Sequence, residues 1–187
     1  IQYPAPGNPE LAGQIADKLM QDGISARINP QRGFDHGVFI PLKMMYPQAD
    51  IPCTQLSLLR GLDAAKHIAL GKALRGLNVS NLLVIGSGFS FHNLQAFDWE
   101  SESQPDATND AFQNWLIETC TAPLPPLERE QRLIHWQQAP SARYCHPREE
   151  HLLPLHVCAG MAAKSAKLVY DDYILGKRNV GFLWEGG

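Results

Sequence analysis

Hydrophobic residues recur at helical spacing along several stretches of the chain. Leu11, Ile15 and Leu19 repeat every four residues, which places them on one face of a helix. Asn8 followed by Pro9 is typical of a helix start, because the asparagine side chain can cap free backbone N–H groups. The same reasoning predicts further helices over residues 38–46, 62–74, 109–120, 127–138 and 149–163. We expect Pro154 to kink the last of these.

Short apolar runs between the helices predict strands. Residues 82–85 read Leu-Leu-Val-Ile, which is typical of a strand that is covered on both faces. Strands are also expected over residues 24–28, 51–58, 173–176 and 180–184. The alternation of the two patterns predicts an α/β fold, a single layered domain with a central mixed β-sheet flanked by helices.

Composition narrows the classes of function. The 187 residues are 44% hydrophobic and 19% charged, which indicates a folded domain with its own core. A net charge of −3 without a basic stripe argues against a nucleic acid as partner. No apolar run approaches the ~20 residues that cross a membrane. No secretory signal is visible and no CxxC pair occurs, so we expect free thiols and a cytoplasmic protein. The cysteines are Cys53, Cys120, Cys145 and Cys158.

Three histidines, His36, His92 and His151, stand beside glycine or proline and next to apolar elements. His92 follows the apolar run 82–85 and two glycines, and ligands of open α/β sheets bind beyond the carboxyl ends of strands. Imidazole is both the commonest protein metal ligand and the usual acid–base group near neutral pH. We therefore predict that folding brings the three side chains into one site. A packing or turn-forming role for each histidine stays open at this point.

Residues around these histidines have more than one interpretation. Asp35 either orients an imidazole by accepting a hydrogen bond or caps the helix that follows. Asn93 can orient a neighbouring group by hydrogen bonding. His146 and His151 are five residues apart, about 140° around a helix, whereas zinc-protease helices carry two histidines four residues apart on one face. The spacing therefore argues against a protease-type zinc site.

Several short motifs occur in a fixed order along the chain. They are residues 3–12 (YPAPGNPELA), 33–37 (GFDHG), 46–52 (YPQADIP), 86–88 (GSG), 92–94 (HNL) and 150–155 (EHLLPL). Together they resemble the class III extradiol ring-cleavage dioxygenases, in the DODA-type, LigB-like branch. Each motif alone is weak, but the combination is specific and spans nearly the whole chain.

The resemblance implies a division of roles among the histidines. His151 corresponds to one of three ligands of a divalent metal, Fe(II) or Zn(II), while His92 corresponds to the catalytic histidine and His36 to a histidine of the pocket. The family's two other ligands are histidines in motifs that precede residues 3–7, so we expect them upstream of Ile1. Residues 1–187 are then expected to be a single catalytic domain, the C-terminal three-quarters of a larger domain, inactive alone and without the family's N-terminal strands.

The function implied by the resemblance is that of an extradiol dioxygenase, which opens the ring of a catechol-type substrate with O2. His92 would act as general acid and base and His36 would stabilise developing charge, with Asp35 and Asn93 binding the substrate. The expected partners are a small aromatic diol and O2, and the oligomeric state is left open. Two other functions fit the same scaffold, since a fold does not fix its chemistry. These are a metal-free, non-catalytic binding protein and a metal-dependent hydrolase of small molecules.

Overall fold

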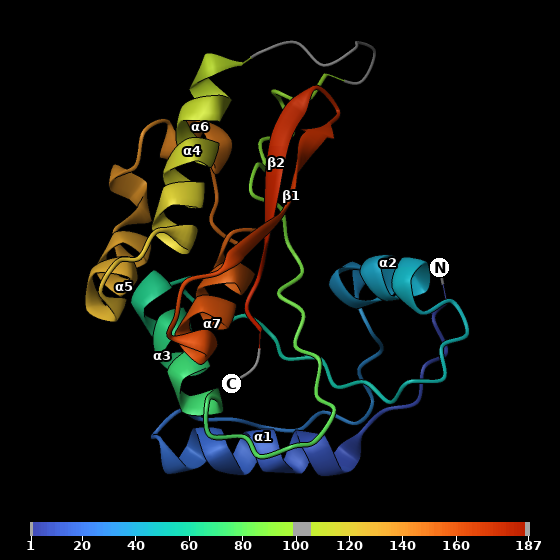
Figure 1. The fold of residues 1–187 in the computed structure, drawn as a ribbon. Helices are drawn as coiled ribbons and strands as arrows, with labels where there is room; N and C mark the ends of the chain where they lie inside the picture. The colour runs from blue at the N-terminus through green and yellow to red at the C-terminus, as the bar shows by residue number, and fades with distance from the viewer. Residues whose placement is uncertain (1, 99–105, 186–187) are drawn as a thin grey trace.

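The computed structural model describes residues 2–98 and 106–185 (Figure 1). Its elements are α1 (Pro9–Gln21), α2 (His36–Met45), α3 (Ala64–Leu74), α4 (Ala107–Thr121), α5 (Pro126–Ile134), the 3-10 helix η1 (Trp136–Gln138), α6 (Ala142–Cys145), α7 (Leu153–Ala162) and the strands β1 (Lys167–Ile174) and β2 (Lys177–Leu183). Helices α3 to α7 gather beside the two strands, α1 lies beneath this group with Leu19 packed against Leu70 and Leu74 of α3, and α2 lies away from it. Most predicted helices are confirmed, with shifted ends.

The principal core lies among the helices of the second half of the chain. Phe91, Phe112, Leu116 and Trp136 are at most 1% exposed and belong to one apolar cluster. Burial of side chains of this size supplies most of the free energy that favours folding. The cluster therefore fixes the extended segment that carries Phe91 against helix α4.

Helices α3 and α7 approach closely because each has a glycine at the contact. A Cβ on Gly71 would lie 2.1 Å from the carbonyl oxygen of Val157, and a Cβ on Gly160 would lie 2.4 Å from that of Ile68. Neither distance is compatible with a side chain, so the two backbones pack at a separation that only glycine permits. This contact anchors α7 and the turn that precedes it.

The described residues contain one sheet, the antiparallel pair β1 and β2. Leu175 and Gly176 join the strands, with φ angles of 50° and 74°. Positive φ at both central residues is typical of the turn that matches the twist of a hairpin. The closing strands predicted from the sequence are thus confirmed, although β1 begins earlier than expected.

The predicted strand over residues 82–85 is wrong. The segment is extended but pairs with no strand of the described chain, and Leu83, Val84 and Ile85 are 55%, 44% and 39% exposed. An apolar run gives a strand only when neighbouring strands supply hydrogen-bond partners. The strands predicted over 24–28 and 51–58 are also not formed, apart from one parallel bridge between Gly7 and Cys53.

The prediction of a kinked helix over residues 149–163 is wrong in its start and in its kink, since α7 spans Leu153–Ala162. The helix begins at Leu153, and Pro154 lies in its first turn. A proline there interrupts no hydrogen bond, because the first N–H groups of a helix have no intrahelical partner. The expected kink is therefore absent, and His151 lies in the turn before the helix.

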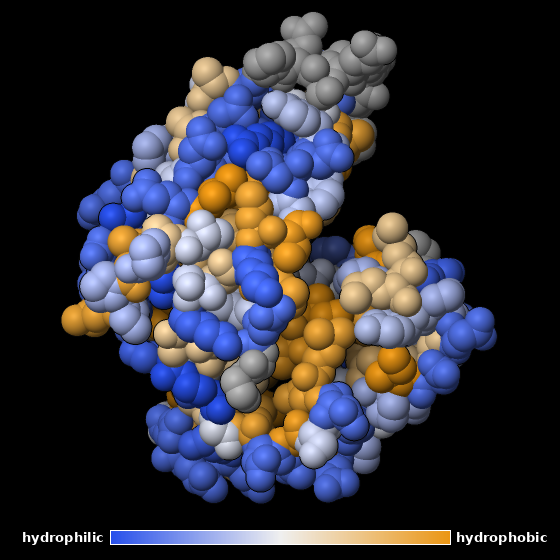
Figure 2. Space-filling view, viewed as in Figure 1, coloured by the Kyte–Doolittle hydropathy of each residue, from blue (hydrophilic) through white to orange (hydrophobic). Residues whose placement is uncertain are grey.

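Helices α1 and α2 differ in how they pack: Leu19 of α1 is buried against Leu70 and Leu74 of α3, whereas α2 is the more open part of the molecule. Asn8 caps α1 as predicted, accepting a hydrogen bond from the Leu11 N–H at 3.0 Å. Helix α2 buries none of its residues, and Met44 is 81% exposed. Figure 2 shows apolar side chains lining a hollow between α2 and the helical group. Within the described residues, no helix has the length and apolar character needed to traverse a bilayer.

Candidate functional site

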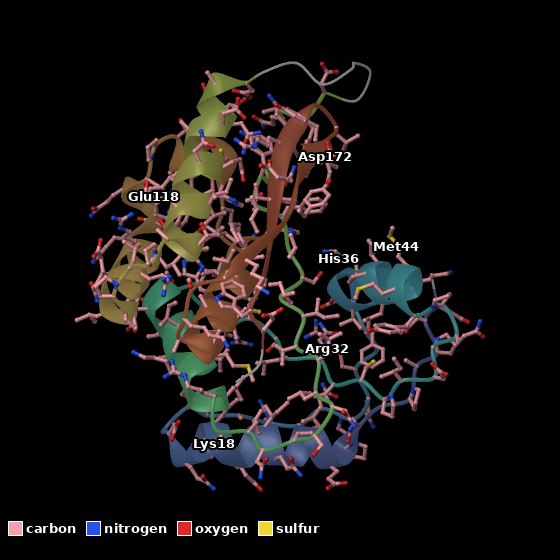
Figure 3. All side chains as sticks on the ribbon, viewed as in Figure 1. Lys18, Arg32, His36, Met44, Glu118 and Asp172 are labelled. Atoms are coloured by element: carbon pink, nitrogen blue, oxygen red, sulfur yellow. The ribbon has the colours of Figure 1, made fainter. Side chains whose placement is uncertain are left out.

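The structure brings together the three histidines that the sequence singles out. The ring centroids of His92 and His151 are 3.4 Å apart and the planes differ by 16°, so the two imidazoles stack face to face. The centroid of His36 lies 6.1 Å from that of His151, with the planes 38° apart. His36 is the first residue of α2 and lies at the inner end of that helix (Figure 3). Three distant segments thus contribute to one cluster, which we call the histidine cluster.

Backbone hydrogen bonds fix two of the three segments to each other. The Phe89 N–H donates to the carbonyl of His151 at 3.1 Å, and the His92 N–H donates to the carbonyl of Cys145 at 2.9 Å. The extended segment therefore runs against the turn that carries His151. The stacked pair is a consequence of this backbone pairing and not of a shared helix.

Gly86 and Gly88 allow this close approach. A Cβ on Gly88 would lie 2.2 Å from the carbonyl oxygen of His151, and one on Gly86 would lie 2.7 Å from the Cys158 sulfur. Neither glycine has a positive φ, so the sharp turn expected from the sequence is not what they provide. Their role is to leave room for the backbone of residues 151–154.

The environment keeps the stacked imidazoles neutral at pH 7. Burial, together with neighbouring His92, lowers the pKa of His151 to about 4, while Glu150 opposes the shift. Burial also lowers the pKa of His92, again against an opposing effect of Glu150. A neutral imidazole carries one free lone pair, which can bind a metal or accept a proton.

The stacking limits how the cluster can bind a metal ion. Imidazole coordinates through a lone pair in its ring plane, and the planes of His92 and His151 are nearly parallel. One ion cannot lie in both planes, so at most one of this pair ligates it in the observed arrangement. Across residues 2–98 and 106–185, no three His, Cys, Asp or Glu side chains are placed to hold a metal. This part of the chain therefore lacks a complete ligand set, and one ring of the stacked pair could supply a single ligand.

Asp35 and Asn93 have local partners. The Asp35 carboxylate caps α2 by accepting from the Gly37 N–H at 3.1 Å, and it also contacts Gln55 and Arg32. Asn93 donates to the carbonyl of Tyr144 at 2.8 Å. The capping interpretation of Asp35 is thus confirmed. Substrate binding by either residue stays a prediction.

Other histidines occupy positions that the sequence did not indicate. His67 is fully buried; its ring accepts from the Leu59 N–H and contacts the carbonyl of Asp63. His156 is buried between the carbonyls of Leu152 and Leu133. His146 is also buried, next to the segment that carries His92. No spacing signal distinguishes such residues from surface histidines, because their burial depends on contacts between distant segments.

Comparison with known proteins gives one consistent result. Residues 1–183 match the family described as the catalytic LigB subunit of aromatic ring-opening dioxygenase. A 4,5-DOPA dioxygenase extradiol of Beta vulgaris is 38% identical over 196 residues, covering 100% of this chain and 65% of that protein. The dioxygenase tasH of Hapsidospora irregularis is 35% identical, covering 100% of this chain and 60% of that protein.

A solved structure supports the same relationship. The crystal structure of an uncharacterized protein from Escherichia coli K12 superposes with a TM-score of 0.82 at 29% identity, covering 96% of this chain and 73% of that one. The predicted α/β, LigB-like fold class is therefore confirmed. The chain spans 60% to 65% of the length of the two curated relatives above.

Proposed function

We propose, since the chain belongs to the family of the catalytic LigB subunit of aromatic ring-opening dioxygenase, that the whole protein is an extradiol dioxygenase. It would open the ring of a catechol-type substrate with O2. Relatives named 4,5-DOPA dioxygenase extradiol make a dihydroxyphenylalanine the first substrate to test. The observation that supports the proposal is the His92–His151 stack with His36 at its side.

The proposed roles follow from the chemistry of each imidazole. His151 would be the metal ligand that residues 1–187 contribute, and two further histidine ligands are expected from sequence upstream of Ile1. The ion would be Fe(II) or Zn(II). Only iron would supply redox chemistry toward O2, because zinc is redox-inert. The residues that the structure describes would supply one ligand of such a centre, and the remaining ligands would have to come from further sequence.

His92 would move a proton. Its neutral ring is free to accept one from a catechol hydroxyl, and its position against His151 places it within reach of a substrate next to the ligand. His36 is more exposed and would donate a hydrogen bond to the substrate or to bound oxygen, which stabilises developing negative charge. Asp35 would support this arrangement by fixing the start of α2.

The test uses the full-length protein loaded with Fe(II) and a panel of catechols, with O2 uptake and the absorbance of the ring-opened product as readouts. His92→Ala should lower turnover about 100-fold or more with the metal content unchanged. His151→Ala should instead lower the metal content. His135→Ala, at an exposed position on the end of α5, is the matched control and should change neither.

Four outcomes would redirect the proposal. Wild-type turnover in His92→Ala would remove His92 from the mechanism, and a full metal content in His151→Ala would reject that ligand. Binding of catechol without O2 uptake would favour the non-catalytic binding protein, and hydrolysis without O2 uptake would favour the hydrolase. The cytoplasmic location stays a prediction, consistent with the four free cysteines.

A further inference from the structure

The segment that carries His92 crosses the core without forming a ladder with any strand of the described chain. Its N–H groups at Phe89 and His92 donate to backbone carbonyls, whereas polar backbone atoms between them bond to side chains, as buried backbone requires. The carbonyl of Ser90 contacts His146 Nε2 at 2.8 Å and accepts from Gln113 Nε2 at 3.1 Å. Both side chains are fully buried. The position of Ser90 is therefore set by two side chains from distant parts of the chain.

The other side of the segment is held as well. Ser90 Oγ accepts from the Val180 N–H at 2.8 Å, and the Phe91 N–H donates to Asn179 Oδ1 at 3.1 Å. Strand β2 thus holds the segment from one side while His146 and Gln113 hold it from the other. The stacked position of His92 follows two residues later.

A histidine at position 146 costs folding free energy, because one of its ring nitrogens has no hydrogen-bond partner in the described structure. Because a carbonyl can only accept, Nε2 must carry the hydrogen, which leaves Nδ1 as a buried acceptor without a partner in the described structure. The ring otherwise meets Phe112 and Trp136, edge to face. An unsatisfied buried acceptor costs about 1–3 kcal/mol, and a leucine would fill such a pocket without that cost. Histidine at this position therefore points to a role for the hydrogen bond to Ser90 other than stabilising the core.

The backbone next to His146 holds the same segment at a second point. The carbonyl of Cys145 accepts from the His92 N–H at 2.9 Å, while the His146 ring holds Ser90. Two consecutive residues, Cys145 and His146, therefore form hydrogen bonds with the segment, at His92 and at Ser90. A shift of Ser90 would move the backbone from which the His92 ring reaches His151.

We propose that His146 is a positioning residue, which holds the Ser90 carbonyl, with Gln113, and so keeps the His92 ring stacked on His151. The effect on catalysis rests on the proposed role of His92 in proton transfer. His146 itself touches neither substrate nor metal, since it is sealed in the core behind the segment. It acts only through the placement of His92.

The kinetic test is a double-mutant cycle in the full-length protein, with 3,4-dihydroxyphenylalanine as substrate. His146→Leu removes the donor and keeps apolar bulk, whereas His146→Gln can place an amide N–H near the Nε2 position. We expect His146→Leu to lower kcat about 10- to 100-fold, because a displacement of about 1 Å can have that effect. KM and metal content should change little, and His146→Gln should recover most of the activity. In a His92→Ala background, His146→Leu should cost less than about twofold.

An equal loss in both backgrounds would overturn the proposal, since it would show a general structural role. Unchanged kcat in His146→Leu would overturn it too. Gln113→Leu removes the other side-chain donor to Ser90 and replaces His146→Leu in the cycle if that variant does not fold. Circular dichroism establishes folding of each variant before kinetics.

A structural readout separates this inference from the proposed function. In a crystal structure of the full-length His146→Leu variant, or of Gln113→Leu, the centroid separation of the His92 and His151 rings should exceed the 3.4 Å of the parent. An unchanged separation would overturn the positioning role whatever the protein catalyses. Full turnover in His92→Ala would reject the proposed function of His92 and leave the result on ring position standing.

Discussion

The two parts of the molecule that meet at the histidine cluster differ in how firmly they are packed. On the helical side, Phe112 and Leu116 are fully buried and close glycine contacts lock α3 against α7. On the other side, α2 buries none of its residues, and Met44 is 81% exposed. His92 and His151 belong to the packed side, whereas His36 comes from α2. The stack of two rings is therefore anchored in a core, and the third ring is held by a loosely packed helix.

The difference bears on what each part contributes to a site. Catalytic groups need neighbours that fix their rotamers and backbone, and His92 has these in the polar residues around Ser90. His36 relies on the Asp35 cap and on the contact of Gln55 with the same carboxylate. We expect perturbations of the helical side to reach His92 and His151, and perturbations of α2 to leave them in place.

The largest expected effect is on the stability of the helical side. Phe112→Ala would remove a fully buried ring from the main cluster and should lower the free energy of unfolding by about 3–5 kcal/mol. Leu127→Ala, at a position 67% exposed on α5, is the matched control and should change it by less than about 0.5 kcal/mol. Urea denaturation of the full-length protein measures both. Similar values for the two variants would show that this cluster is not the stabilising core.

The helices were the most predictable part of the fold. Asn8 and Pro9 give the start of α1 directly, because capping is a local interaction. The prediction of a strand over residues 82–85 was wrong, because strand formation depends on partner strands elsewhere in the chain, which a local pattern does not include. The kink predicted at Pro154 was wrong for a related reason. A proline kinks a helix when it lies inside it but is accommodated in the first turn, and the position of the helix start decides between the two.

The candidate site was predictable in outline and not in detail. Glycine and proline beside His36, His92 and His151 marked the segments, and the structure shows their rings together. The stacking itself arises from backbone contacts between distant segments. His146 gave no signal because burial of a polar residue breaks the usual sequence pattern, and only tertiary contacts reveal it.

A second prediction concerns the close contact beneath the cluster. In Gly88→Ala the new Cβ would meet the carbonyl oxygen of His151 at 2.2 Å, so one of the two backbones must shift. We expect a loss of about 3 kcal/mol in the free energy of unfolding, at the upper end of overpacking effects, together with a displaced His151. Gly33→Ala is the control, since nothing lies within 4 Å of its Cβ position. Thermal and urea unfolding compare the variants, and a stable Gly88→Ala with unchanged His151 would contradict the packing argument.

A third prediction concerns pH. Burial lowers the pKa of His146 to about 4, against a hydrogen bond to Ser90 that opposes the shift. The unfolded chain protonates this imidazole near pH 6.5 and the folded protein does not. The stabilisation from neutral His146 is therefore complete above about pH 6.5 and is lost as the pH falls toward 4, by on the order of 2 kcal/mol at pH 5.

The comparison with His146→Gln isolates this contribution. The variant lacks the titrating group, so its free energy of unfolding should fall less than that of the parent between pH 7.5 and pH 5. Other buried histidines titrate in both proteins and cancel in the difference. Parallel pH profiles for the two proteins would show that His146 is protonated in the folded state already near pH 6.5.

The smallest expected effect lies on the open side of the molecule. Met44 is 81% exposed on α2, so Met44→Gln should change the free energy of unfolding of the full-length protein by less than about 0.5 kcal/mol and leave the turnover unchanged. A loss well above 1 kcal/mol would show that further sequence covers this face, because only a buried methionine is so sensitive to a polar replacement. His36 would then be as firmly placed as the stacked pair, and the difference between the two sides of the cluster would disappear.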